Sequence, residues 1–177
     1  MAEKKPRGRR PWLDDIQLDG SGKYAYKGSH MKFSGDALQR KRYLWRLGVY
    51  MGGAAACTVA AGCLNVGDLD NTMYVLIPYM IEVIAAVAFV WSSCRLLLGG
   101  SVLRSYVYDQ TVKRLPVLAV ILFAGAAATL CGAAVFLILH KTIGVFTVLY
   151  LLLHAVVLTL SLLGFKVLRE AKWETIE

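Results

Sequence analysis

The chain has 177 residues, of which 57% are hydrophobic and 18% are charged, and its formal net charge is +8. Soluble domains carry about 25% charged residues, so this composition argues against a soluble enzyme, a disordered chain or a disulfide scaffold. Nucleic-acid binding is also disfavoured, because the basic residues flank long apolar runs instead of gathering on one folded face. The composition predicts a small integral membrane protein.

Residues 1–35 form a polar segment that we expect to be cytoplasmic and mostly irregular. Five basic residues within its first ten suit the anionic lipids of the inner leaflet, although a solvated retention signal for topology explains them equally well. Trp12 is a further candidate for contact with lipid or a partner. Tyr24 and Tyr26 would fall on one side of a short extended segment, which could dock on the membrane surface or on a partner strand.

Residues 36–177 are predicted to form one transmembrane domain. Ser34 or Asp36 can cap a helix that runs directly into the first apolar stretch. Arg42 and Trp45 lie at the entry to that stretch, where basic and aromatic residues anchor a helix at the lipid headgroups. The first helix is therefore expected to be held at the inner surface of the membrane.

Four stretches are long and apolar enough to cross a bilayer, which requires about 20 residues of helix. They are residues 47–66, 73–94, 115–139 and 143–165. The three residues between the last two stretches force these to be antiparallel neighbours. The predicted fold is an all-α membrane protein, a bundle of four transmembrane helices.

The orientation follows from the distribution of lysine and arginine, which are retained on the cytoplasmic side. Nineteen of the 20 Lys and Arg residues lie in residues 1–46, 95–114 and 166–177, whereas Lys141 alone lies on the other side. Both termini are therefore predicted to be cytoplasmic, in a multi-pass protein of the plasma membrane. Most of the net charge therefore indicates the orientation of the protein in the membrane and does not point to a charged ligand.

The loop at residues 95–114 is predicted to contain an amphipathic helix. Val102, Leu103, Tyr106 and Val107 recur at helical spacing, and Asp109 and Lys113 have the spacing of an ion pair within a helix. Such a helix could lie in the inner interface of the membrane. A connector whose apolar face packs under the bundle explains the same spacing equally well.

Small residues recur every fourth position in two of the spans, a pattern that lets helices approach closely. The first set is Gly48, Gly52, Ala56 and Ala60, and the second is Ala124, Ala128 and Gly132. Packing within one bundle is the preferred interpretation, and an oligomer interface is the alternative. Either interpretation assigns these residues to helix packing.

Glu82 is the one charged residue inside a predicted span, where a charge costs on the order of 3 kcal/mol or more. It should face the bundle interior, and His154 lies at a comparable depth on a parallel span. Pro78 frees a backbone carbonyl nearby, which could extend a polar pocket. Glu82 could be a proton or cation site, or a neutral acid that joins helices by bonding to His154, Thr147 or Ser161.

No catalytic, phosphate-binding or zinc-binding motif is found in the sequence. The four cysteines lie in or beside the spans and have neither the spacing of metal ligands nor histidines at ligand spacing. We therefore expect no enzyme activity, no metal and no cofactor.

Two motifs precede the spans, a Pro-Trp-Leu-Asp-Asp run at residues 11–15 and Gly-Lys-Tyr-Ala-Tyr-Lys-Gly at residues 22–28. With the four spans and a basic tail containing Trp173, this layout resembles a group of uncharacterised small four-span membrane proteins of Gram-positive bacteria. The resemblance covers most of the chain and implies compartment and topology, without an activity.

The sequence thus predicts an accessory, assembly or regulatory component of the bacterial membrane. Its expected partners are the bilayer with its anionic lipids, and either another membrane protein or further copies of itself. The alternative is a small proton- or cation-coupled carrier or channel that uses Glu82.

Overall fold

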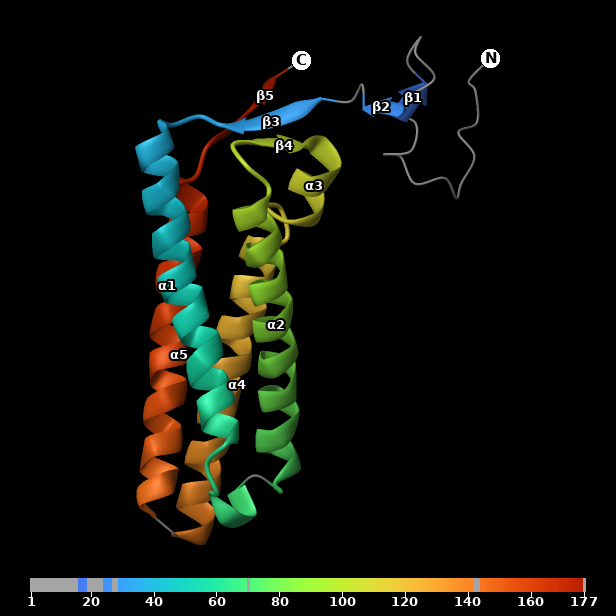
Figure 1. The fold of residues 1–177 in the computed structure, drawn as a ribbon. Coiled ribbons are helices and arrows are strands. Elements are labelled where there is room, and N and C mark those ends of the chain that lie inside the picture. The colour runs from blue at the N-terminus through green and yellow to red at the C-terminus, as the bar shows by residue number, and fades with distance from the viewer. Residues whose placement is uncertain (1–15, 19–23, 27–28, 70, 142–143, 177) are drawn as a thin grey trace, which may run out of the picture.

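The computed structural model describes residues 16–18, 24–26, 29–69, 71–141 and 144–176. Four long helices run antiparallel in an elongated bundle, and short strands gather at one end of it (Figure 1). The long helices are α1 (Ala37–Gly62), α2 (Met73–Leu98), α4 (Leu115–His140) and α5 (Val145–Glu170). The short elements are β1 (Ile16–Leu18), β2 (Tyr24–Tyr26), β3 (His30–Phe33), η2 (Gly67–Leu69), β4 (Val102–Arg104), α3 (Ser105–Gln110) and β5 (Trp173–Ile176).

The bundle is held by one buried stripe along each long helix, with members three or four residues apart. On α1 the stripe is Tyr43, Leu47, Met51, Ala54, Thr58 and Ala61, and on α5 it is Thr147, Tyr150, His154, Val157, Ser161, Gly164 and Leu168. The mean spacing is 3.6 residues on α1 and 3.5 on α5, close to that of helices that pack at about 20° to one another. Each helix packs against two neighbours, so α1 contacts α2 and α5, while α4 contacts α2 and α5.

The outward faces of the bundle are apolar, which is the reverse of a soluble protein. Many large hydrophobic side chains are exposed, among them Ile84, Trp91, Ile138, Phe146 and Leu152. A continuous apolar surface of this kind needs a cover, and lipid supplies one. By length and composition, three helices can cross a membrane: α2, the α3–α4 segment Ser105–His140, and α5. These helices suggest a membrane protein.

Helix α1 does not meet the same criterion, so the structure supports three of the four predicted spans. The physical reason is its composition. Its first turns carry Arg40, Lys41, Arg42 and Arg46, and its remainder is rich in glycine and alanine, which contribute little hydrophobicity. The helix also ends at Gly62, whereas the sequence predicts that the span continues to residue 66.

A three-stranded antiparallel sheet of order β4-β3-β5 lies at one end of the bundle and joins segments that are distant in sequence (Figure 1). Strand β3 precedes α1, β4 follows α2, and β5 follows α5. Met31 pairs with Leu103 on one side and with Thr175 on the other. A separate hairpin pairs β1 with β2. Within the segment at residues 1–35, which the sequence predicts to be mostly irregular, the structure describes three short strands, and β3 finds its two partners only in the folded chain.

The predicted amphipathic loop helix also needs correction. Val102 and Leu103 belong to strand β4, and only residues 105–110 are helical, in the short helix α3. Leu103 is buried in the main core and Val107 packs against it, whereas Val102 is exposed. Pairing with β3 outweighs the local helical spacing. The ion pair between Asp109 and Lys113 forms as the spacing predicts, at 2.7 Å.

Aromatic side chains fasten the sheet to the bundle. Trp173 of β5 packs edge-on against Phe33 of β3 with ring centroids 5.6 Å apart, and against Tyr108 of α3 at 5.5 Å. Phe33 in turn stacks on Tyr43 of α1 at 5.6 Å. The carboxyl end of the described chain is thus held to three other segments.

Replacing Trp173 with alanine is expected to release strand β5, since two ring contacts worth about 0.5–1.5 kcal/mol each are lost. Trypsin should then cleave after Lys172 at least fivefold faster, which can be timed by mass spectrometry of the intact protein. The control is Ile176→Ala, a change at an exposed position of the same strand. Equal cleavage rates in both variants would contradict the fastening role.

Candidate functional site

A cluster of buried polar side chains lies in the middle of the bundle, and each long helix contributes to it. Its members are Thr58 of α1, Glu82 of α2, Thr129 of α4 and His154 of α5, all fully buried. Each occupies a position on the inward stripe of its helix. The bundle therefore places at one level the polar residues that the sequence distributes over four helices.

The Glu82 carboxyl is the centre of this cluster. Thr58 Oγ1 donates a hydrogen bond to Glu82 Oε1 at 2.7 Å, whereas Thr129 Oγ1 donates to the Gly125 carbonyl at 3.0 Å. Glu82 Oε2 lies 3.5 Å from His154 Nε2. Neither of these two atoms has another hydrogen-bond partner in the part of the chain that the structure describes.

The hydrogen bonding of His154 determines which of its ring nitrogens carries a proton. His154 Nδ1 lies 3.0 Å from the carbonyl oxygen of Tyr150, one turn earlier on α5. Because a carbonyl only accepts, Nδ1 must donate, and in a neutral ring Nε2 is then an acceptor. Glu82 Oε2 and His154 Nε2 are therefore two acceptors that face each other, and one proton between them satisfies both.

That single proton also determines the charge of the site. With it, the pair is either a neutral acid beside a neutral imidazole or a carboxylate beside an imidazolium, and the net charge is zero. Without it, an uncompensated carboxylate would remain at the centre of an apolar bundle, which costs several kcal/mol. The geometry thus favours a pair that binds one proton tightly.

Tyr79 and Tyr150 surround the imidazole. The Tyr150 ring lies 4.3 Å from that of His154, and the Tyr79 ring lies edge-on to it at 5.9 Å. The Tyr79 hydroxyl donates to the backbone carbonyl of Thr58 at 3.1 Å. A Cβ atom at Gly62 would lie 2.0 Å from this hydroxyl oxygen, so the glycine leaves room for it.

The structure brings Glu82 and His154 together, but it assigns different hydroxyl groups to the carboxyl than the sequence suggested. None of the described hydrogen bonds joins Glu82 to Thr147 or Ser161, and Ser161 Oγ donates to the Leu158 carbonyl. Thr147 and Ser161 share a stripe with His154 but lie seven residues, two turns, to either side of it. The sequence signal for Thr58 is its polar side chain on an otherwise apolar inward stripe.

Pro78 frees a carbonyl that another helix then covers. Without an N–H group, Pro78 leaves the Tyr74 carbonyl without its usual partner within α2. Gly132 of α4 packs against this carbonyl so closely that a Cβ atom there would lie 2.8 Å from the Tyr74 oxygen. Two turns nearer the sheet, Gly125 packs against Glu82, and a Cβ atom at Gly125 would lie 3.1–3.3 Å from the Cβ, Cα and backbone N atoms of Glu82. Pro78 therefore serves the contact between α2 and α4.

The two sets of small residues divide between the inside and the outside of the bundle. Gly132 is buried, whereas Ala124 and Ala128 are exposed, so the stripe of α4 that packs includes Gly125 and Gly132. Gly48, Gly52, Ala56 and Ala60 are all exposed, and a Cβ at Gly48 or Gly52 meets nothing within 4 Å. The set on α1 does not pack inside this bundle, because the inward stripe of α1 runs through Met51, Ala54 and Thr58.

The predicted contact residues near the sheet have separate positions. Trp45 is 69% exposed on α1, and Arg42 is exposed beside Phe33 and Val167. Tyr24 and Tyr26 lie on strand β2, whereas Trp12 lies outside the described residues. Arg42 and Trp45 line different hollows on the surface of α1.

No protein-family model, curated protein or solved structure matches the chain. The class of protein therefore rests on the fold and the site. Together they describe a helical bundle with three helices apolar enough to span a membrane and a buried polar cluster at its centre.

Proposed function

We propose that the chain is a four-span protein of the bacterial cytoplasmic membrane that acts as an accessory, assembly or regulatory component and not as an enzyme. Helix α1 is the fourth span in this proposal. It has the same length as the other three and packs lengthwise against α5, so it lies at the same depth in the bilayer. Residues 47–62 of α1 carry no charge.

The orientation in this proposal is supported by the position of the basic residues. In the described part of the chain, every Lys and Arg except Lys141 belongs to the end of the bundle that carries the sheet. That end is then cytoplasmic, since basic flanks are retained there. In this proposal the sheet and both termini are cytoplasmic.

The topology is tested by labelling single cysteines in intact cells, after Cys57, Cys63, Cys94 and Cys131 are replaced. We expect a cysteine at Asp68, in η2, to react with an impermeant maleimide, and one at Ser101, beside β4, to react only after the cells are opened. Both residues are exposed in the fold, so a difference reports membrane sidedness. The opposite pattern would contradict the orientation.

The observation that carries the accessory role is the sheet itself. Among the residues that the structure describes, β3 is the central strand of the sheet, and β4 and β5 are its edge strands. Open edges bind a strand of another protein through main-chain hydrogen bonds. The sheet therefore offers a docking site built from three segments of the chain.

Co-purification in mild detergent tests this role with two deletions. Deleting residues 1–28 leaves all three strands, whereas deleting residues 1–35 removes β3 from the middle of the sheet. We expect a stoichiometric second polypeptide with the full chain and with the first deletion, and its loss with the second. Recovery of the chain alone from all three preparations would contradict the accessory role.

A second function is favoured by one observation, the 3.5 Å distance between Glu82 Oε2 and His154 Nε2, two acceptor atoms that can share one proton. Exchange of this proton with both sides of the membrane would make the protein a small proton-coupled carrier. Proton flux into liposomes tests it, with Glu82→Gln as the variant, because glutamine cannot exchange a proton in this range of pH. Flux in the parent and loss in the variant would support a carrier, whereas equal or no flux would remove it.

A further inference from the structure

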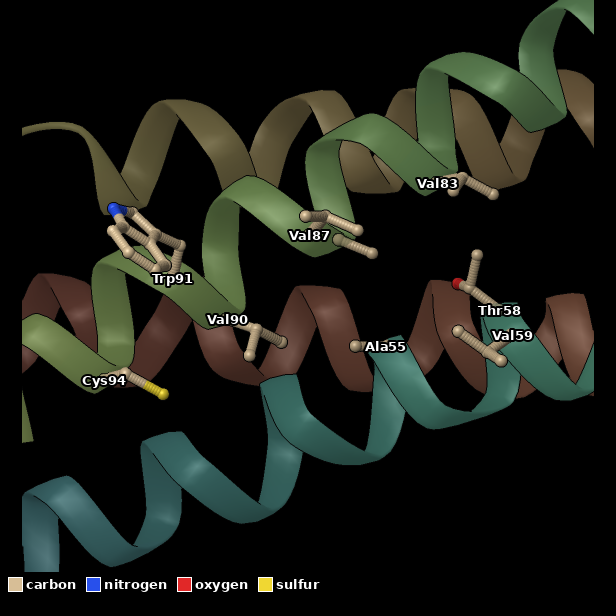
Figure 2. Close-up of a pocket in the computed structure, with 9 residues that line it drawn as sticks. Ala55, Thr58, Val59, Val83, Val87, Val90, Trp91 and Cys94 are labelled. Carbon is tan, nitrogen blue, oxygen red and sulfur yellow. The ribbon is translucent and has the colours of Figure 1, made fainter.

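An open groove runs between α1 and α2 on the outside of the bundle. It contains a hollow of about 280 Å³ nearer the bundle centre and one of about 650 Å³ nearer the sheet. The inner hollow is apolar, and Ala55 and Val59 of α1 face Val83, Val87, Val90 and Trp91 of α2 across it (Figure 2). The outer hollow is bounded by Arg40, Lys41, Leu44, Trp45, Gly48 and Leu97.

The small residues of α1 keep this groove open. Gly48 lines the outer hollow, Gly52 lies one turn further along, and a Cβ atom at either would meet nothing within 4 Å. The α1–α2 side is also the least closely packed of the four sides of the bundle. The two glycines therefore leave space in the groove, and this role is distinct from helix packing within the chain.

The groove changes from basic to apolar along its length. Lys41 is exposed at the mouth, and beside it the guanidinium of Arg40 donates through Nη2 to the Gly100 carbonyl, while its Nε is buried. From Gly48 to Thr58 is ten residues, or about 15 Å of helix, which is the depth of one leaflet of hydrocarbon. A cationic mouth above an apolar channel of this depth matches a lipid with an anionic headgroup.

We propose that the α1–α2 groove binds an anionic glycerophospholipid, with its phosphate at Lys41 and Arg40 and one acyl chain between the helices as far as Thr58. This inference rests on the membrane placement proposed above. Trp45 at the mouth suits the headgroup depth. A second copy fits less well, because a two-fold axis along the membrane normal would bring its own Arg40 and Lys41 to the same level. A lipid phosphate neutralises these charges instead.

Native mass spectrometry of the purified chain in detergent tests the proposal, with phosphatidylglycerol and phosphatidylcholine as probes. We expect a one-to-one complex with phosphatidylglycerol that is markedly tighter than with phosphatidylcholine. Lys41→Gln should weaken phosphatidylglycerol binding about fivefold, since one basic residue near a lipid phosphate contributes about that factor. Gly48→Leu should weaken binding of both lipids, because its side chain enters the groove.

Two matched controls make the result specific. Arg42→Gln removes the same charge one residue along, on a different face of α1, and Ala128→Leu places the same leucine side chain at an exposed site on α4. Both should bind as the parent does. Equal binding of the two lipids, or equal binding by groove and control variants, would overturn the proposal, as would a dimer that Gly48→Leu dissociates. Each of these outcomes leaves the membrane topology intact, whereas failure of the cysteine-labelling test would overturn the topology itself.

Discussion

Replacing Glu82 with alanine is expected to lower the free energy of unfolding by about 3–5 kcal/mol, the usual cost of removing one partner from a buried pair. The change leaves His154 Nε2 and the Thr58 hydroxyl without the carboxyl that both contact. The measurement is an SDS titration of the protein in dodecyl maltoside micelles, followed by circular dichroism. We expect the transition to move to a clearly lower SDS fraction.

The glutamine variant at the same position separates hydrogen bonding from charge. Its carbonyl oxygen can accept from Thr58 while its amide donates to His154 Nε2, so Glu82→Gln should unfold within about 1 kcal/mol of the parent. Equal, small losses for alanine and glutamine would show that the cluster contributes little to stability. A loss for glutamine as large as that for alanine would show that the carboxylate charge, and not the hydrogen bonds, is what His154 requires.

Replacing Gly132 with leucine should be at least as damaging, because the new side chain has no space between α2 and α4. Its Cβ atom would lie 2.8 Å from the backbone oxygen of Tyr74 and 3.3 Å from a methyl group of Val75. Overpacking typically costs 1–3 kcal/mol and more where backbone must move, as it must here. We expect a sharply reduced yield of monodisperse protein on size-exclusion chromatography and an earlier transition in SDS.

Gly52→Leu provides the matched control, since it adds the same bulk to a glycine in the middle of α1. A Cβ atom at Gly52 meets nothing within 4 Å, so this variant should fold like the parent. Gly132→Ala should give an intermediate loss, because the contact with the Tyr74 oxygen arises at the Cβ atom itself. A Gly132→Leu variant as stable as Gly52→Leu would contradict the close approach of α2 and α4.

The Glu82 variants also bear on the two proposed functions. A cluster that only joins helices should affect stability and leave every flux measurement unchanged. A proton carrier should lose flux in Glu82→Gln, the variant whose fold is expected to survive. The glutamine variant therefore distinguishes a structural from a transport role, whereas the alanine variant confounds them.

Much of the fold follows from local pattern. Long apolar runs mark α2, α4 and α5, and α2 and α4 begin at Met73 and Leu115, where the sequence predicts. The pairing of Glu82 with His154 is also predictable from the sequence. A buried acid needs a partner, and the rise per residue of a helix gives the depth of each residue in the bilayer. These inferences use only neighbours along the chain and the thickness of a bilayer.

Other features depend on which faces meet, which spacing along one helix does not reveal. Ala128 and Thr129 are adjacent in sequence, yet one is exposed and the other belongs to the polar cluster. Likewise, the small residues Gly52 and Gly125 have opposite surroundings, open space in one case and the Glu82 backbone in the other. In each case, the angular position of the residue about its own helix axis decides whether it faces outward or toward a neighbouring helix.

Length, composition and charge by themselves indicate that this chain suits a membrane. They also indicate which side of the predicted spans carries the basic residues, because both features depend on the transfer of segments between water and lipid. Only the tertiary structure decided that Thr58, Glu82, Thr129 and His154 share one level of the bundle, and that β3 joins β4 and β5. These arrangements depend on contacts between segments far apart in sequence. The net charge of +8 therefore indicates how the chain is oriented, whereas the packing of the helices determines the polar cluster.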